Sequence, residues 1–421
     1  MNRRFAAALV DISPLRESLP YRALWFGQMI SLLGSNMRLV AVAWQVYELT
    51  NSTVAVGLVG LVEVVPLITV SIIGGTFIDT SDRKRLIATC QVALMICSGA
   101  LAVLSLTGTI TVLWIYVLTG IASAFNAMDR PARSSLLPHV IPEGKMSSAM
   151  ALRQVLFQTT TIVGPAIGGI LVGAISVGWV YLIDAVSFSA ALFILRWIPP
   201  IPRGDQLAEG RWSAIKEGLS FATRTPVLLS IFVIDLVAMI FGMPRAVFPA
   251  LAKDTFHMGA EGVGILYAAP AVGALIGALT TGWVGAVKRQ GLAVLLAVTA
   301  WGAAIALAGL SLFSLALTVL FLALAGAADV VSAVFRGTIL LEKTPPALLG
   351  RVNALNIMVV TGGPRLGDIE AGLVAGVAGA PASVVLGGVA CLLGTGAVAG
   401  MFPSLRTYRA HREPATPSSS S

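Results

Sequence analysis

Eight ionisable side chains lie inside apolar stretches of this sequence, where a charge is costly. Placing a charge at the centre of a lipid bilayer costs on the order of 2.5–3.5 kcal/mol on insertion scales, and residues kept there usually have a function. In that setting a carboxyl group can exchange a proton and a guanidinium can bind an anion. The eight residues are Arg38, Glu63, Asp184, Asp235, Asp329, Arg365, Asp368 and Glu370.

Residue types that do bond chemistry are scattered. The histidines and cysteines are His139, His257, His411, Cys90, Cys97 and Cys391. They show no metal-ligand spacing, and cysteines in apolar stretches are typical of small buried hydrophobes. No nucleophile–base pair and no glycine-rich phosphate loop appears, which disfavours an enzyme and an ATP-driven mechanism. We therefore expect no metal site and no cofactor.

A polar wall runs along one face of the first apolar stretch. It consists of Gln28, Ser31, Ser35, Arg38, Val42 and Gln45. On a helix of 3.6 residues per turn these positions fall within about 100°. Lipid would not tolerate that wall, so Gln28, Ser35, Arg38 and Gln45 are candidates for the lining of a central substrate cavity. The alternative is a helix–helix seam of small polar residues.

Glu63 is the predicted partner of Arg38. Both residues lie about twelve or thirteen positions from the turn between the first two stretches, so they reach a similar depth at 1.5 Å per residue. The pair is either static, or Arg38 binds an anionic substrate group, or Glu63 exchanges a proton when Arg38 is drawn away. The functional interpretation predicts that Glu63→Gln impairs transport more than folding.

A similar stripe follows residues 149–174. It consists of Gln154, Gln158, Thr161, Pro165 and Gly168. The first three are candidates for the cavity lining. The glycines would permit close packing and bending, as gating needs; simple small-residue packing is the alternative.

The composition requires a membrane to hold these stretches. Of 421 residues, 57% are hydrophobic and 11% charged, with mean hydropathy +0.88, whereas soluble domains carry about 25% charged residues. About 20 apolar residues cross a bilayer as a helix. Twelve stretches qualify: 22–47, 53–78, 86–107, 110–128, 149–174, 177–198, 226–248, 261–286, 291–311, 313–335, 351–377 and 381–402.

Lysine and arginine predict the orientation. With the N-terminus in the cytoplasm, 24 of the 28 basic residues fall in cytoplasmic segments, as the positive-inside rule requires. Both termini are then cytoplasmic in the cell membrane, and the net charge of +8 needs no nucleic-acid partner. Residues 1–22 lack the apolar core and cleavage site of a signal peptide. The composition of residues 403–421 predicts a disordered tail.

An internal repeat relates the two halves of the chain. A shift of 203 residues aligns Arg133 with Arg336 and Gly169 with Gly372, with the loops in register. The resulting organisation is an all-α polytopic membrane protein of two six-helix halves. The expected segments are an N-terminal segment 1–21, a half 22–198, a linker 199–225, a half 226–402 and a tail 403–421.

The stretch 351–377 gives conflicting signals. Asn353, Asn356, Gly363, Gly367 and Glu370 share one helical face, which makes Asn356 and Glu370 cavity candidates. The repeat instead favours the face with Thr361, Pro364 and Asp368. If Arg365 pairs with Asp368, three positions away, Glu370 stays unpaired and desolvation favours its protonated form. We therefore rank Glu370 first and Asp368 second among proton-coupling candidates.

Three further carboxylates complete the ionisable set. Asp235, in the seventh stretch, is another candidate for proton coupling, as is Glu63. Asp184 lies near the outer end of the sixth stretch, where an interfacial position would explain it. Asp329 lies nearer the cytoplasm and is a candidate gating contact.

Several segments resemble the major facilitator superfamily. Gly74–Arg85 combines a glycine pair, Asp79 at a helix end and a basic cluster, as in the superfamily's loop between spans 2 and 3. Gly164–Gly169 looks like the glycine–proline element of exporters. With Asp129–Arg133, Phe248–Ala252 and Arg365–Gly372, these segments are similar to the subgroup that contains the enterobactin exporter and drug–proton antiporters.

The resemblance implies gating residues. They are Gly75, Asp79, Asp82, Arg83, Gly164, Pro165 and Gly168. A carboxylate such as Asp79 can accept hydrogen bonds from the N-terminus of a neighbouring helix, which would lock the halves in the outward-facing state. Asp79→Asn is then expected to abolish transport without preventing insertion. A solvated basic loop that only sets topology is the alternative.

Two positions depart from the superfamily pattern. Thr80 stands where an arginine usually follows the aspartate, and the fourth stretch, 110–128, lacks the mid-membrane arginine of many proton antiporters. The standard proton relay is therefore not carried over.

The favoured function is secondary active export of a small organic compound, such as a siderophore, a drug or a hydrophobic metabolite, by proton antiport with alternating access. Proton-coupled uptake is the alternative within the same class. A non-transporting receptor or assembly factor would not need the polar stripes and buried charges. The expected partners are the small-molecule substrate and the lipid bilayer, with no obligate protein partner and a monomeric state.

Overall fold

The chain folds into helices throughout the described residues of this computed structural model, which are 11–80, 82–198 and 211–409. The first half of the chain supplies a short entry helix and six long helices. Their bounds are α2 (Ser13–Glu17), α3 (Leu19–Thr50), α4 (Thr53–Thr80), α5 (Arg83–Leu106), α6 (Val112–Val140), α7 (Met146–Ala174), α8 (Val177–Ile194) and η1 (Leu195–Trp197).

The second half repeats this order after a surface helix. Its elements are α9 (Arg211–Arg224), α10 (Pro226–Phe241), η2 (Arg245–Val247), α11 (Phe248–Ala250), η3 (Leu251–Thr255), α12 (Ala260–Thr280), η4 (Thr281–Ala286), α13 (Gln290–Leu310), α14 (Leu315–Lys343), η5 (Pro346–Leu348), α15 (Leu349–Ala378), α16 (Ala380–Met401) and α17 (Pro403–Arg406). We call α3–α8 the N-half and α10–α16 the C-half.

Ten spans of the described chain are long and apolar enough to cross a bilayer, and one of them, Pro226–Thr255, runs from α10 through η3; two further helices are long enough but more polar. The two others, α3 and α15, have 32 and 30 residues. They are the helices on which the sequence placed polar faces and ionisable residues. Polarity on these two helices indicates that they face the interior of the bundle rather than lipid.

The internal repeat is visible in the helix bounds. Helices α6 and α14 begin and end 203 residues apart, and α7 and α15 begin 203 residues apart. The exception is the first helix of each half, because α3 is continuous whereas α10 stops at Phe241 before Gly242–Pro244. Proline lacks a backbone donor and disfavours a helical residue before it, so the seventh span ends in short helical pieces.

Two glycine seams join the halves. A Cβ on Gly169 of α7 would lie 2.9 Å from Cα of Gly264 on α12, and a Cβ on Gly372 of α15 would lie 3.0 Å from Cα of Gly57 on α4. Gly169 and Gly372 are equivalent in the repeat, so a pseudo-two-fold axis relates the seams. Only glycine permits backbones to approach this closely.

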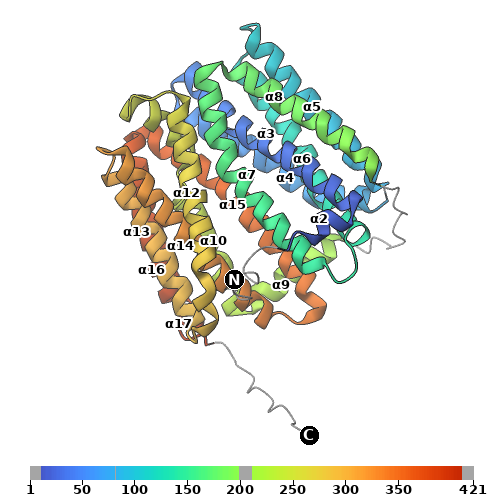
Figure 1. Cartoon of the computed structure of the whole chain (residues 1–421). Coiled ribbons are helices and arrows are strands. Elements are labelled where there is room, and N and C mark those ends of the chain that lie inside the picture. Colours follow the sequence, from blue (N-terminus) through green and yellow to red (C-terminus); the bar gives the residue numbers. More distant parts are fainter. Residues whose placement is uncertain (1–10, 81, 199–210, 410–421) are drawn as a thin grey trace, which may run out of the picture.

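The halves meet at one end of the bundle and diverge at the other. We call the end at which the described chain begins and ends proximal, and the opposite end distal. Figure 1 shows α7 and α12 close together at the distal end and separating toward the proximal end. Distal contacts between the halves include Lys253 Nζ to Asn51 Oδ1 at 2.9 Å and a hydrogen bond from Tyr47 to Asp254. The central space is therefore closed distally.

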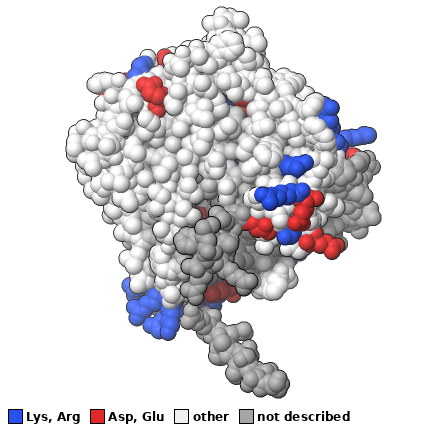
Figure 2. Space-filling view, in the orientation of Figure 1, with Lys and Arg blue, Asp and Glu red and all other residues white. Residues whose placement is uncertain are grey.

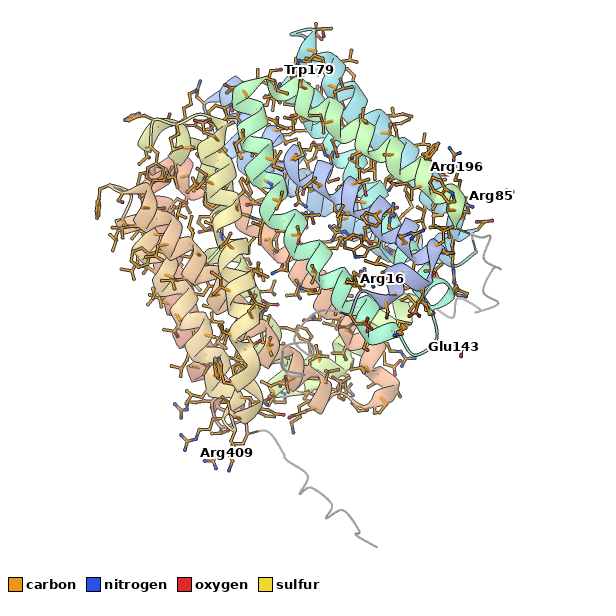
Figure 3. The ribbon with its side chains drawn as sticks, in the orientation of Figure 1. Arg16, Arg85, Glu143, Trp179, Arg196 and Arg409 are labelled. Carbon is orange, nitrogen blue, oxygen red and sulfur yellow. The ribbon has the colours of Figure 1, made fainter. Side chains whose placement is uncertain are left out.

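Charged side chains gather at the proximal end. Most of the face in Figure 2 carries no charge, and blue and red atoms concentrate along its lower and right-hand edges, with a smaller group at the upper left. Figure 3 places Arg85, Arg196 and Arg409 at those edges and Arg16 on the face to the right of centre, with Trp179 at the opposite end. An uncharged band between polar ends is what a bilayer requires.

Helix α6 extends well beyond the predicted stretch 110–128. It continues to Val140, so Asp129, Arg130 and Arg133 lie on a membrane helix and not in a loop. The continuation is stabilised by the ion pair of Arg133 Nε with Asp129 Oδ2 at 2.6 Å, one turn apart. A prediction based on hydrophobicity alone ends this span too early, because it treats the charged residues Asp129 and Arg133 as part of a solvent-exposed loop although they pair with each other.

The connecting segments also differ from expectation. Part of the predicted linker 199–225 is helical, as α9, while 199–210 lie outside the described residues. In the predicted tail, Pro403–Arg406 form α17, and 410–421 lie outside the described residues.

Candidate functional site

A central pocket lies between the halves. The N-half contributes residues of α3, α4 and α6, and the C-half contributes residues of η2, α12 and α15. The lining residues are Ser35, Arg38, Leu39, Val42, Ala43, Val56, Val59, Gly60, Glu63, Thr119, Ala246, Tyr267 and Asp368. The lining combines an aliphatic wall with both acidic and basic groups.

Arg38 lines this pocket but pairs inside the N-half. Its Nε lies 3.1 Å from Oδ2 of Asp184 on α8, and Ser98 donates to the same oxygen at 2.6 Å. The Asp184 side chain is fully buried. The predicted pairing with Glu63 is therefore wrong, and so is the interfacial position of Asp184. Counting residues from the turn placed Arg38 at the depth of the pocket, but it could not predict that the side chain contacts α8.

Glu63 forms an ion pair across the two halves. Its Oε2 lies 3.0 Å from Nε of Arg365 on α15. Arg365 also donates from Nη1 to the carbonyl oxygen of Thr361 at 2.7 Å. The predicted pairing of Arg365 with Asp368 is wrong, because Arg365 points toward α4.

Asp368 pairs instead with Arg245 of η2, with Nη2 and Oδ2 3.5 Å apart. Tyr267 of α12 also donates to the Arg245 carbonyl oxygen at 3.5 Å. The break after α10 thus places an arginine of the C-half at the pocket. The sequence did not identify this role for Arg245.

The cavity-facing side of α15 is the one that the repeat predicts. Asp368 lines the pocket, whereas Glu370 does not. The opposite face packs within the C-half, since a Cβ on Gly363 or Gly367 would meet Met239 of α10 at 2.8 and 2.5 Å. Glu370 is half-buried and has no hydrogen bond or ion pair to the described side chains. Its cavity-facing assignment is wrong, and its titration remains a prediction.

Three pocket residues have buried polar atoms without a partner among the described residues. They are Nη1 of Arg38, Oγ1 of Thr119 and Oδ1 of Asp368. Burying a polar atom without a hydrogen bond costs about 1–3 kcal/mol. These donors and acceptors are therefore available to a polar ligand or to water in the pocket.

Asp235 lies in the core of the C-half. It is buried and pairs with Arg336 of α14, which also approaches Asp329 at 3.8 Å. Neither carboxylate lines the pocket. The proton-coupling role of Asp235 and the gating role of Asp329 remain predictions. In this structure both carboxylates interact with Arg336 inside the C-half.

The predicted polar lining separates into three groups. Ser35 lines the pocket, as predicted. Gln45 does not, because its amide donates to Ser105 at 2.7 Å and accepts from Tyr181 at 2.9 Å inside the N-half. The others lie outside this pocket and remain predictions: Gln28, Gln154, Gln158, Thr161 and Asn356.

The gating glycines pack against α3. A Cβ on Gly164 would lie 2.5 Å from Asn36, and one on Gly168 would lie 2.8 Å from Met37. The carbonyl of Pro165 contacts Gly264 in the seam with α12. This region of α7 therefore packs against both halves.

The predicted inner gate is only partly described. Asp82 caps its own helix, accepting from the Arg85 amide at 3.0 Å, and Arg83 donates to the Ser135 carbonyl of the same half at 3.1 Å. Neither forms a hydrogen bond or ion pair with the described residues of the C-half in this conformation. The side chain of Asp79 and residue Gly75 lie outside the described side chains, so the lock stays a prediction.

Arg130 is the residue that the sequence reasoning missed. Thr119, Ser123, Asn126 and Arg130 follow one another at helical spacing on α6. Thr119 lines the pocket, and Ser123 donates to the Glu63 carbonyl at 2.7 Å. Arg130 thus continues the pocket-facing side of α6. The periodicity was available in the sequence once α6 is extended past residue 128.

Comparison with known families agrees with this architecture. The family described as transmembrane secretion effector, a group of major facilitator transporters, matches residues 10–419. The chain belongs to this transporter family. Enterobactin exporters of Shigella boydii and Escherichia coli O81 are each 30% identical to it over 351 residues, covering 82% of this chain and 83% of theirs.

Solved structures share the transporter's fold. The nucleoside transporter NupG superposes with TM-score 0.72 at 15% identity, over 91% of this transporter and 98% of that chain. A bacterial homologue of the human lysosomal transporter Spinster gives TM-score 0.72 at 15% identity, over 92% and 98%. The protein is a twelve-helix membrane transporter and not an enzyme.

Proposed function

We propose that this transporter exports a small organic compound from the cytoplasm across the cell membrane by alternating access, driven by proton antiport. The observation that carries the proposal is a central pocket whose two walls come from different halves and are bridged by Glu63 and Arg365. A pocket built in this way changes shape whenever the halves rock against each other.

The proximal end is assigned to the cytoplasm. Arginine side chains concentrate there (Figure 3), and the positive-inside rule places such residues on the cytoplasmic side. With the distal seams closed, this conformation then presents the central space to the cytoplasm. Substrate would enter from that side, as export requires.

The substrate class follows from the pocket and the relatives. The lining combines aliphatic side chains with charged ones, which suits an amphipathic molecule. Relatives at 30% identity are enterobactin exporters. A siderophore, a drug or a hydrophobic metabolite fits both observations.

Proton coupling is assigned first to Glu63 and Asp368. Each carboxylate lies in the pocket beside an arginine in this conformation. Opening the distal seams would separate Glu63 from Arg365, and a carboxylate without its counter-ion takes up a proton more readily. Glu370 and Asp235 are the remaining candidates.

A monomer without an obligate protein partner is sufficient for this function. The lipid bilayer and the transported solute are the partners that the mechanism needs.

Everted membrane vesicles test the proposal. A pH-sensitive dye reports collapse of a preformed proton gradient when siderophores, antibiotics or cationic dyes are added. We expect at least one compound to evoke a response that Glu63→Gln and Asp368→Asn abolish. Glu143→Gln, an exposed carboxylate at the proximal edge (Figure 3), is the matched control and keeps the response. Compound accumulation in intact cells, driven by the protein, would contradict export.

A further inference from the structure

Arg130 is an arginine without a counter-ion inside the membrane bundle. It lies on α6 between Asp129 and Arg133, which neutralise each other. Among the described residues, no hydrogen bond or ion pair reaches its guanidinium, and its side chain is exposed. A charge without a counter-ion on a membrane helix is typical of a ligand or ion pathway.

The exposure of Arg130 is toward the central space and not toward lipid. It shares a face of α6 with Thr119 of the pocket and Ser123, which is hydrogen-bonded to α4. The lipid-facing side of α6 carries Val117 and Ile121, which line an apolar groove on the outside of α4 and α6. At about 100° per residue, that side is nearly opposite Arg130.

Arg130 and Arg365 converge from opposite helices. Side chains tilt toward the N-terminus of their helix. For α6 this direction leads distally, toward the pocket; for α15 it leads proximally, as the bond from Arg365 to the Thr361 carbonyl shows. The charged groups that act on Arg130 are Arg365, Glu63, Asp129 and Arg153.

The charges around this point do not cancel. Glu63 neutralises Arg365 at 3.0 Å, which leaves Arg130 as an excess cation facing another guanidinium. Arg153, toward the proximal opening, donates to Ser134 and has no carboxylate partner in the described chain. Arginines hold oxyanions through directed, charge-assisted hydrogen bonds. An anionic ligand would therefore supply the negative charge that balances Arg130.

We propose that Arg130, facing Arg365, binds the acidic group of a transported organic anion whose apolar body occupies the central pocket. Arg130 lies eleven residues beyond Thr119, about 16 Å along the helix, and its side chain leans back toward the pocket. The ligand is thus an amphipathic anion, with its acidic group on the proximal side. This inference rests on the proposed export function and specifies its substrate class.

Two dyes with one scaffold and opposite charge test the site. Fluorescein is an anion and rhodamine 123, whose carboxyl group is methyl-esterified, is a cation, both built on xanthene. Fluorescence anisotropy measures their binding to the full-length protein in non-ionic detergent. We expect the wild type to prefer fluorescein, Arg130→Gln to weaken its binding roughly tenfold, and Arg130→Lys to retain most of it, because a bound oxyanion needs the positive charge.

Arg289→Gln is the matched control, since Arg289 is an exposed arginine at the proximal surface outside the pocket. It is expected to leave fluorescein binding unchanged. The assignment is overturned if the wild type shows no preference for the anion, or if Arg130→Gln binds fluorescein as the wild type does. It is also overturned if phosphatidylglycerol in the micelle displaces fluorescein stoichiometrically, because the site would then hold a lipid phosphate.

The vesicle experiment separates this inference from the proposed function. If Arg130→Gln retains proton-linked export of every responding compound, the anion site is wrong and export stands. If no compound is exported by the wild type, the proposed function fails whatever the dyes show.

Discussion

Arg38 and Asp184 form the most deeply buried ion pair at the pocket, with side chains 10% and 0% exposed. Removing one partner of a buried pair leaves an uncompensated charge and costs about 3–5 kcal/mol. We expect Asp184→Ala to lower the free energy of unfolding by that amount. Thermal unfolding of the purified protein in detergent measures the change.

The double variant Arg38→Met with Asp184→Leu controls for packing. Replacing both charges by apolar groups is often neutral, so the double variant should recover most of the lost stability. A double variant as unstable as Asp184→Ala alone would show that the pair is not the cause.

The ion pair between Glu63 and Arg365 is expected to hold the halves together distally. Reversing one charge, as in Glu63→Arg, opposes two like charges and costs several kcal/mol. Crosslinking of Asn51→Cys to Lys253→Cys by a short bifunctional thiol reagent reports distal closure, and it should fall at least about tenfold in the single reversal.

Adding Arg365→Glu to Glu63→Arg restores the attraction and is expected to restore crosslinking. The native cysteines Cys90, Cys97 and Cys391 are buried and do not compete. If the double reversal crosslinks no better than the single one, the pair plays no part in closure.

Individual ionisable residues were identifiable from the sequence, but their partners were not. Counting from the turn gave Arg38 and Glu63 a common depth, and both line one pocket. The count contains no information on which neighbouring helix a side chain meets. Asp184, 146 positions after Arg38, is the partner because α3 packs against α8.

Among the helices, the seam between α7 and α12 limits what the distal end can do. A Cβ at Gly169 would lie 2.5 Å from the Ala260 carbonyl oxygen, a backbone atom that cannot move independently. Gly169→Val is therefore expected to hold the distal end open, to abolish transport and to prevent the crosslink between positions 51 and 253.

Gly396→Val on α16 is the control, since a Cβ there meets nothing within 4 Å. It should transport and crosslink like the parent protein. Normal distal crosslinking in Gly169→Val would refute the role of the seam.

The sequence predicted helix positions best where the repeat supplied a second observation. The bounds of α14 match those of α6 shifted by 203 residues. The extension of α6 to Val140 escaped detection because charges paired within one helix look like a loop in a hydropathy scan. The break after α10 also escaped, although Pro244 and Pro249 were visible, because prolines are common in membrane helices that do continue.

At the scale of the whole molecule, the two halves are joined at the distal end and diverge toward the proximal end. Alternating access requires a second conformation in which these two ends exchange roles. A ligand shifts such an equilibrium only by its difference in affinity for the two states. Both ends must therefore respond to the same ligand or proton, in opposite directions.

Paired distance measurements test this claim most directly. Spin labels at Asn51 and Lys253 report the distal end, and labels at Ala151 and Ala278, both exposed, report the proximal end on the faces of α7 and α12 that carry the seam. Across a pH series and with an exported compound, the account predicts that the distal distance lengthens as the proximal distance shortens. Distances that stay fixed at both ends, or change in the same direction, would contradict it.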